Sequence, residues 1–170
     1  MGNIVSRREF LKFTGGAAAG AAALPGTAHA APAPDTGSAT LQFKSKMLGK
    51  GGALPVNQPV TFSFPDASSP CALIKMGTPV LGGVGPNQDI VAYSTMCTHM
   101  GCPVAYDGTQ RLFKCGCHFS MFDAEKGGQM VCGQATENLP RIVLNYSDKD
   151  DSVTAVSVDG LLYGRQSNAL

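Results

Sequence analysis

The pattern of hydrophobic and polar positions after residue 40 predicts short β-strands rather than helices. Leu41 and Phe43 alternate with polar neighbours, which is the period of a half-buried strand. The same alternation recurs at Val60, Phe62 and Phe64. No stretch is long enough for a sustained amphipathic helix, and 21 glycines, 11 prolines and no tryptophan suit many strands joined by turns. The pattern favours a small, mostly β, antiparallel protein.

Three further apolar runs predict strands near the cysteines and histidines of the chain. Residues 72–76 form a run bounded by prolines and a glycine, and residues 90–93 lead into a Cys-Thr-His segment. Residues 112–114 lead into a second segment with cysteines and a histidine, and Asp107-Gly108 gives a turn before it. A strand-loop-strand-loop unit of this kind brings the two segments to the same tip.

The remaining pattern predicts one loop, one strand and one hairpin. Residues 49–55 read as a loop, and residues 142–144 read as an alternating strand. Asp159-Gly160 suits a type I′ turn, so we expect a hairpin between residues 153–158 and residues 161–164.

The amino terminus has the three regions of a twin-arginine export signal. Residues 6–12 carry paired arginines, residues 14–24 are a Gly/Ala-rich apolar run, and Ala28-His29-Ala30 forms a cleavage site. The apolar run is too short for a comfortable membrane span, so we expect cleavage and at most peripheral membrane contact. This route carries folded proteins to the periplasm, which suits a cofactor inserted before export. The predicted organisation is a signal peptide at residues 1–30, an extended leader at 31–40 and a single domain at 41–170.

The charge balance excludes two classes of partner. Without residues 1–30, ten basic and eleven acidic residues leave a net charge near −1. The chain therefore offers no basic stripe for nucleic acid and no polybasic patch for a membrane surface.

Every histidine after residue 30 lies in one of two short segments. Cys97 and His99 form a C-x-H pattern, and Cys115 and His118 form a C-x-x-H pattern. Each segment supplies one thiolate and one imidazole to a shared centre. Such a set fits either a tetrahedral zinc ion or a Rieske two-iron two-sulfur cluster.

The segments C-T-H-M-G-C and C-G-C-H-F-S resemble the two cluster-binding boxes of Rieske iron–sulfur proteins. The resemblance implies an antiparallel β-sandwich with a cluster-binding subdomain of two loops at its tip. It also implies that Cys97 and Cys115 bind one iron of a 2Fe-2S cluster and that His99 and His118 bind the other. Two neutral ligands raise the reduction potential, and the chain needs no catalytic residue because it only transfers electrons.

The resemblance implies roles for four further residues. In the high-potential branch of the family, the positions of Cys102 and Cys117 form a disulfide between the loops, which a bare zinc site would not explain. Ser120 stands where the family uses a hydroxyl to hydrogen-bond a bridging sulfide and raise the potential. Phe122 stands where respiratory members usually carry a tyrosine that bonds a ligand sulfur. We therefore expect a reduction potential below that of the quinol-oxidising complexes. In a redox titration, Phe122→Tyr should shift this potential upward.

Other residues near the two segments have more than one interpretation. Gly116 replaces the usual proline and Phe119 the usual glycine, so the quinol-binding role of the family does not transfer directly. Met100 and Phe119 form either an apolar rim for docking or packing between the loops. Cys71 and Cys132 are expected to be buried free thiols. The charged turn at residues 148–151 is expected to be only solvated.

A longer pattern points to one branch of the family. The stretch C-G-C-H-F-S-M-F-D together with G-Q-A-T-E-N-L-P at residues 133–140 resembles the small, Rieske subunit of bacterial arsenite oxidase. The resemblance implies a large molybdopterin subunit that oxidises arsenite, and a c-type cytochrome or azurin that accepts the electrons from this chain. The alternatives are the Rieske subunit of a quinol-oxidising cytochrome complex and a zinc-stabilised binding module.

Overall fold

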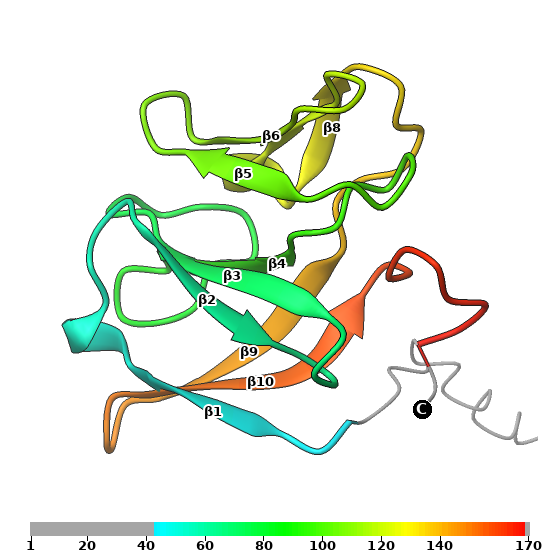
Figure 1. Cartoon of the computed structure of the whole chain (residues 1–170). Helices are drawn as coiled ribbons and strands as arrows, with labels where there is room; N and C mark the ends of the chain where they lie inside the picture. Colours follow the sequence, from blue (N-terminus) through cyan, green and yellow to red (C-terminus); the bar gives the residue numbers. More distant parts are fainter. Residues whose placement is uncertain (1–42, 169–170) are drawn as a thin grey trace, which may run out of the picture. The chain divides into compact units, whose positions relative to one another are not determined.

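The computed structural model describes residues 43–168, so the predicted signal peptide and leader lie outside the described residues. Ten strands in this range form two antiparallel sheets, joined by loops and two short 3-10 turns (Figure 1). Within the same range, no helix has the length and apolar character needed to cross a bilayer. The predicted all-β, antiparallel fold is confirmed.

The six-stranded sheet, here called the base, has the order β1-β10-β9-β4-β3-β2. Its strands are β1 Lys46–Lys50, β2 Pro59–Ser63, β3 Pro70–Lys75, β4 Ile90–Ser94, β9 Arg141–Ser147 and β10 Ser152–Asp159, with the 3-10 turn η1 at Gly51–Ala53.

The four-stranded sheet has the order β5-β6-β7-β8 and is inserted in the chain between β4 and β9. Its elements are β5 Val104–Asp107, β6 Leu112–Cys115, β7 Met121–Asp123, the 3-10 turn η2 at Ala124–Lys126 and β8 Gln129–Cys132. We call residues 95–139 the tip subdomain, and Figure 1 shows its strands above the base.

Strands β3 and β4 are buried on both faces. Leu73 and Ala92 point into an apolar core that lies within the base. Ile74, Val91 and Tyr93 point the other way, into a second core shared with the tip subdomain. Because successive side chains of a strand alternate between faces, this double burial explains why both strands are almost continuously apolar. The base and the tip subdomain therefore pack as one body.

Two buried or half-buried tyrosines connect the base to the tip subdomain. The Tyr93 hydroxyl donates to the Ala124 carbonyl at 2.8 Å, and burial raises the pKa of Tyr93. The Tyr106 hydroxyl donates to Oδ1 of Asn57 at 2.7 Å. Nδ2 of Asn57 in turn donates to the Gly108 carbonyl at 2.8 Å. These bonds fix the orientation of the tip subdomain on the base.

Most predicted strands are present. The alternating residues 60–64 coincide with β2 except for Phe64, which lies just beyond it. The runs at 72–76, 90–93, 112–114 and 142–144 coincide with β3, β4, β6 and β9 except for Met76, which lies just beyond β3. The Asp107-Gly108 turn connects β5 to β6.

The predicted hairpin around Asp159-Gly160 is wrong. Strand β10 ends at Asp159 and pairs with β9 and β1, and residues 161–164 form no strand. Gly160 has φ +97°, and the chain then turns so that Leu162 is buried in the base core. The hairpin that exists joins β9 to β10 through residues 148–151.

Two predictions near the start of the domain are wrong within the residues that the structure describes. Leu41 lies outside the described residues, and Phe43 precedes β1, which begins at Lys46. Phe43 instead packs its ring edge-on against Phe64, with the ring centroids 5.8 Å apart. The predicted loop at 49–55 is partly strand, because β1 continues to Lys50.

The charged turn between β9 and β10 is more than solvated surface. Asp151 has φ +58°, and its carboxylate accepts from the Tyr146 hydroxyl and from the Gly52 amide, each at 2.8 Å. These two bonds, with the Gly52 amide as the larger cause, lower the pKa of Asp151. The turn is thereby joined to η1.

Candidate metal centre

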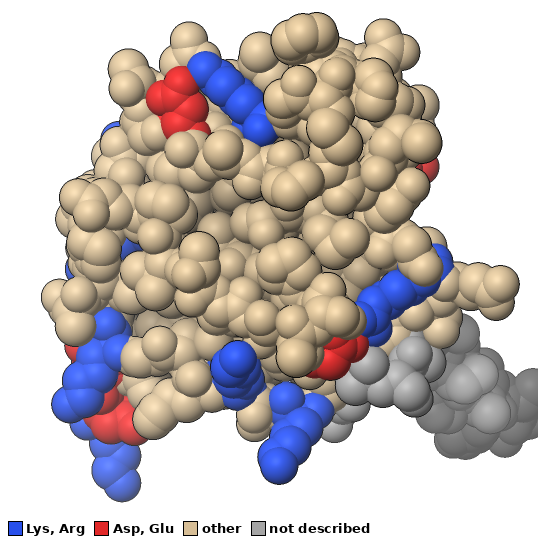
Figure 2. Space-filling view, viewed as in Figure 1, with Lys and Arg blue, Asp and Glu red and all other residues tan. Residues whose placement is uncertain are grey.

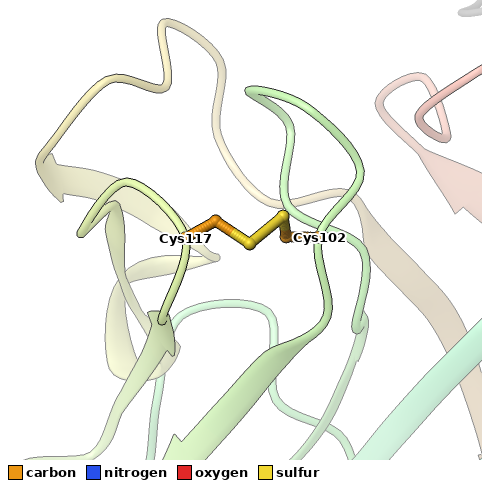
Figure 3. The surroundings of a disulfide bond; sticks show 2 residues. All are labelled: Cys102 and Cys117. Carbon is orange, nitrogen blue, oxygen red and sulfur yellow. A yellow bond between two sulfur atoms is a disulfide. The ribbon is translucent and has the colours of Figure 1, made fainter.

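Two loops of the tip subdomain carry the cysteines and histidines that the sequence singles out. The first loop, residues 95–103, follows β4, and the second, residues 116–120, joins β6 to β7. A disulfide between Cys102 and Cys117 connects them (Figure 3). This is the pairing implied by the family resemblance.

The other two cysteines of these segments are buried free thiols that lie side by side. Cys97 is 1% exposed and Cys115 is 3% exposed, and the two thiols are close enough to hydrogen-bond each other. Burial raises the pKa of Cys97, although the backbone amides of His99 and Met100 donate to its sulfur.

Amide donors also surround the second thiol. Burial opposes ionisation of Cys115, but hydrogen bonds from the backbone amides of Cys117 and His118 outweigh it and lower the pKa of Cys115. Amides directed at a sulfur stabilise the thiolate, which is the form that binds metal.

The two histidines meet at the outer side of the same site. The rings of His99 and His118 pack edge to face, with centroids 4.7 Å apart. His118 is exposed and His99 is half-buried, yet Nδ1 of His99 is buried and has no hydrogen-bond partner among the described residues. A buried ring nitrogen without a partner is unfavourable unless a ligand occupies it. Two adjacent thiols and two adjacent imidazoles fit a centre with sulfur and nitrogen ligands.

Three sulfur atoms, those of Cys102, Cys115 and Cys117, lie within 4.8 Å of one another. They do not form a metal site of their own, because Cys102 and Cys117 are bonded to each other and offer no thiolate.

Tight backbone turns shape the first loop. The Cys97 amide donates to the Cys102 carbonyl, and the Gly101 amide donates to the Cys97 carbonyl, each at 2.8 Å. Gly101 has φ +72°, and a Cβ there would lie 2.4 Å from the Tyr163 ring. Only glycine satisfies both the left-handed backbone and the close approach of this ring.

The second loop is closed by a hydrogen bond from the Cys115 amide to the Ser120 carbonyl at 2.8 Å. Phe119 lies in this loop with φ +60°, a left-handed conformation that costs about 1 kcal/mol for a residue with a Cβ. This conformation gives a physical reason why the family usually has glycine here.

A third segment, residues 133–139, holds both loops from one side. Oγ of Ser120 accepts from the Gln134 amide at 3.1 Å and from the Ala135 amide at 3.0 Å. The Thr98 hydroxyl donates to the Glu137 carbonyl at 2.8 Å. The sequence pattern G-Q-A-T-E-N-L-P indicated a branch of the family but gave no sign of this structural role.

The structure distinguishes between interpretations of four other residues. Phe122 is 0% exposed and belongs to the shared core. Met100 is 58% exposed and Phe119 is 73% exposed, so packing between the loops is wrong for both side chains. Cys132 is free but exposed, so its predicted burial is wrong.

The predicted buried free thiol at Cys71 is confirmed, and burial raises the pKa of Cys71 to about 12. This thiol is therefore unreactive at neutral pH.

The surface near the two loops is almost free of formal charge. Residues 95–106, 115–122 and 127–136 contain no Asp, Glu, Lys or Arg. Figure 2 shows most of the basic and acidic atoms over the lower part of the molecule, on the side of the base, and a mainly uncharged surface above.

Comparison with known proteins identifies the centre. Residues 53–144 match the Rieske [2Fe-2S] domain. The chain belongs to the Rieske iron–sulfur family. A Rieske domain carries a 2Fe-2S cluster and transfers electrons, so the zinc-module alternative is wrong. Residues 5–25 match a twin-arginine translocation signal, so this Rieske protein is exported to the periplasm.

Two relatives of this Rieske protein match over nearly its whole length. Iodate reductase subunit IdrB of Denitromonas iodatirespirans is 40% identical over 96% of this chain and 86% of the relative. IdrB of Pseudomonas sp. (strain SCT) is 37% identical over 96% of this chain and 84% of the relative. The chain is therefore related to an electron-transfer subunit of an oxidoreductase.

Other Rieske proteins match more narrowly. The cytochrome bc1 complex Rieske subunit of Streptomyces lividans is 38% identical, but over 37% of this chain and 38% of the relative. The soluble domain of Rieske protein II (soxF) from Sulfolobus acidocaldarius superposes with a TM-score of 0.63 at 20% identity, over 75% of this chain and 84% of that domain. The latter match supports the fold.

Proposed function

We propose that this chain is the Rieske electron-transfer subunit of a periplasmic arsenite oxidase. The observation that carries the proposal is the pairing of C-G-C-H-F-S-M-F-D with G-Q-A-T-E-N-L-P, which resembles the small subunit of that enzyme. The second of these stretches contacts both loops of the metal centre through Ser120 and Thr98. The residues that carry the resemblance therefore include ones that contact the metal centre directly.

The arrangement of the donors supports the proposed ligands. Cys97 and Cys115 supply thiolates from the buried side, and His99 and His118 supply imidazoles from the outer side. When bound, the cluster accepts and returns one electron. The exposed His118 would give the electron a short path to the surface. On the side of the thiolates, burial of Cys97 and Cys115 excludes water, and the disulfide restricts movement of the two loops.

The proposed partners are a large molybdopterin-containing subunit and a c-type cytochrome or azurin. The large subunit oxidises arsenite and supplies the electrons, and the small acceptor removes them. In this scheme the residues that bind arsenite all lie on the large subunit, and this chain contributes no catalytic residue.

Iodate reductase is the second candidate, because two relatives that match nearly the whole chain are subunits of that enzyme. The chain serves either enzyme in the same way, since an electron and not the oxyanion passes through it. A quinol-oxidising complex is a third candidate with less support. The match to a bc1 Rieske subunit of Streptomyces lividans covers 37% of this chain, and Phe122 lacks the hydroxyl usual in respiratory members.

The deciding experiment isolates the native protein from periplasm together with the large subunit that co-purifies. The complex is then mixed with arsenite and an oxidised c-type cytochrome or azurin, and in parallel with iodate and a reductant. We expect arsenite to reduce the acceptor. Turnover with iodate alone would establish the second candidate, and co-purification with a cytochrome b would establish the third.

A further inference from the structure

The hydroxyl of Ser120 has both of its acceptor positions filled. Ser120 is 0% exposed, and its Oγ accepts from the amides of Gln134 and Ala135 at 3.1 Å and 3.0 Å. A serine hydroxyl has two lone pairs and one proton. With Cβ and two donated hydrogens around the oxygen, only one tetrahedral direction is left for its own O–H bond.

No hydrogen bond among residues 43–168 uses this proton, although the side chain is fully buried. A buried donor without an acceptor is unfavourable. Ser120 lies two residues after His118, and its carbonyl accepts from the Cys115 amide at 2.8 Å. The serine is therefore attached to the same loop as two of the proposed ligands.

We propose that the backbone of residues 133–135 positions the Ser120 hydroxyl as a donor to the cluster and thereby raises its reduction potential. Gln134 and Ala135 are positioning residues in this scheme, because they act through Ser120. The inference rests on the ligand assignment proposed above. It adds a structural cause for the direction and strength of the serine hydrogen bond.

Two physical effects act in the same direction. The paired amides prevent the hydroxyl from rotating, so its proton cannot turn to another acceptor. They also polarise the O–H bond, because hydrogen bonds in a chain strengthen one another in a low-dielectric interior. A stronger donor stabilises the reduced cluster, which carries one more negative charge.

Gly133 makes this close approach possible. It has φ +99°, and a Cβ at this position would lie 2.3 Å from the Ser120 Cα and 2.6 Å from the Phe119 carbonyl oxygen. Neither backbone atom can move aside without displacing the loop. Any other residue at 133 would push the two amides away from Oγ.

The test compares two substitutions at an exposed position whose side chain has no part in the proposal. Gln134→Pro removes the backbone N–H, whereas Gln134→Ala keeps it. Midpoint potentials are measured by redox titration of the full chain, followed by the electron paramagnetic resonance signal of the reduced cluster. We expect Gln134→Pro to lower the equilibrium constant of reduction about fivefold, and Gln134→Ala to leave it unchanged.

A double-mutant cycle separates positioning from general damage. If residue 134 acts through the hydroxyl, Gln134→Pro has no further effect in a Ser120→Ala background. An equal fall in both backgrounds, or no fall in either, would overturn the inference. If Gln134→Pro does not fold, Gly133→Ala takes its place, with a potential expected close to that of Ser120→Ala. Absence of a Rieske signal in the unmodified protein would instead contradict the cluster ligands themselves.

Discussion

The base buries a core that belongs to it alone, whereas the tip subdomain has no apolar core that it does not share with the base. The tip subdomain is instead closed by one disulfide and by hydrogen bonds from amides and hydroxyls. Its ion pairs, Arg111–Glu125, Lys114–Asp107 and Lys126–Asp123, involve none of the residues of the two loops. The difference is that the base has an apolar core of its own, while the two loops of the tip subdomain hold their functional groups and contain no formally charged residue.

Because the base has its own apolar core, the two loops of the tip subdomain can be uncharged. A formal charge beside a metal centre changes the reduction potential and attracts or repels a partner, whereas neutral amides and hydroxyls act only over short distances. Exposed Met100 and Phe119 then remain as the apolar surface beside the histidines.

The largest expected effect comes from removing a proposed ligand. Cys115→Ala should abolish the electron paramagnetic resonance signal of the cluster, because one iron loses a thiolate. The matched control is Cys132→Ala, which removes a free but exposed thiol and should leave the signal intact. A normal signal in Cys115→Ala would show that this cysteine is not a ligand. Circular dichroism should still report the base sheet, since its own core is untouched.

The second effect concerns the disulfide. Replacing Cys102 and Cys117 together with alanine removes a cross-link between residues 15 apart, which should lower the free energy of unfolding by about 3 kcal/mol. The cluster should also be released faster on warming, because the two loops can separate. Denaturant titration measures the first change and the decay of visible absorbance measures the second. An unchanged release rate would mean that the shared core, and not the disulfide, holds the loops together.

The third effect tests a bond that crosses between the two regions. Tyr93→Phe leaves the Ala124 carbonyl without its donor in a buried position, so we expect a loss of about 1–2 kcal/mol in unfolding free energy. Tyr146→Phe is the control, because its hydroxyl bonds Asp151 within the base at a more exposed place. If Tyr146→Phe lost more unfolding free energy than Tyr93→Phe, the bond between the two regions would not be the more stabilising of the two.

The smallest effect is confined to the base and depends on pH. The guanidinium of Arg165 beside Asp66 is the largest cause that holds the pKa of Asp66 well below its usual range. A lowered folded pKa stabilises the fold above the unfolded value of about 3.9, and this contribution is lost as the pH falls further. Arg165→Gln should therefore unfold about 1 kcal/mol more easily at pH 7, as expected for a partly exposed pair. The two proteins should converge in strong acid, and a constant difference across all pH values would exclude the pair as its source.

Much of the fold followed from local patterns. Alternation identified β2 and β9, and apolar runs identified β3, β4 and β6, because burial on one or both faces is recorded directly in the residue sequence. The failed hairpin at Asp159-Gly160 shows the limit of such signals. The dipeptide suits a turn, but after Gly160 the chain buries Leu162 in the base core, and residues 161–164 form no strand.

The candidate site likewise has features that the sequence reveals and features that it does not. Its cysteines and histidines are visible as motifs, since metal ligands must be of a few residue types. The supporting contacts are not visible, because Asn57, Asp151 and Thr98 act through bonds to residues between 39 and 99 positions away. The exposure of Cys132 likewise depends on β8 lying at the edge of its sheet, which its neighbours in sequence do not reveal.

The double burial of β3 and β4 also bears on the order in which the protein is made ready for export. Cys97 follows β4 closely and is buried in the same shared core as Val91 and Tyr93. We therefore expect the iron–sulfur centre to be completed only once the tip subdomain is packed on the base. A chain that reaches the twin-arginine route in a folded state is then already able to hold its cluster, so two shared strands link export to cofactor loading.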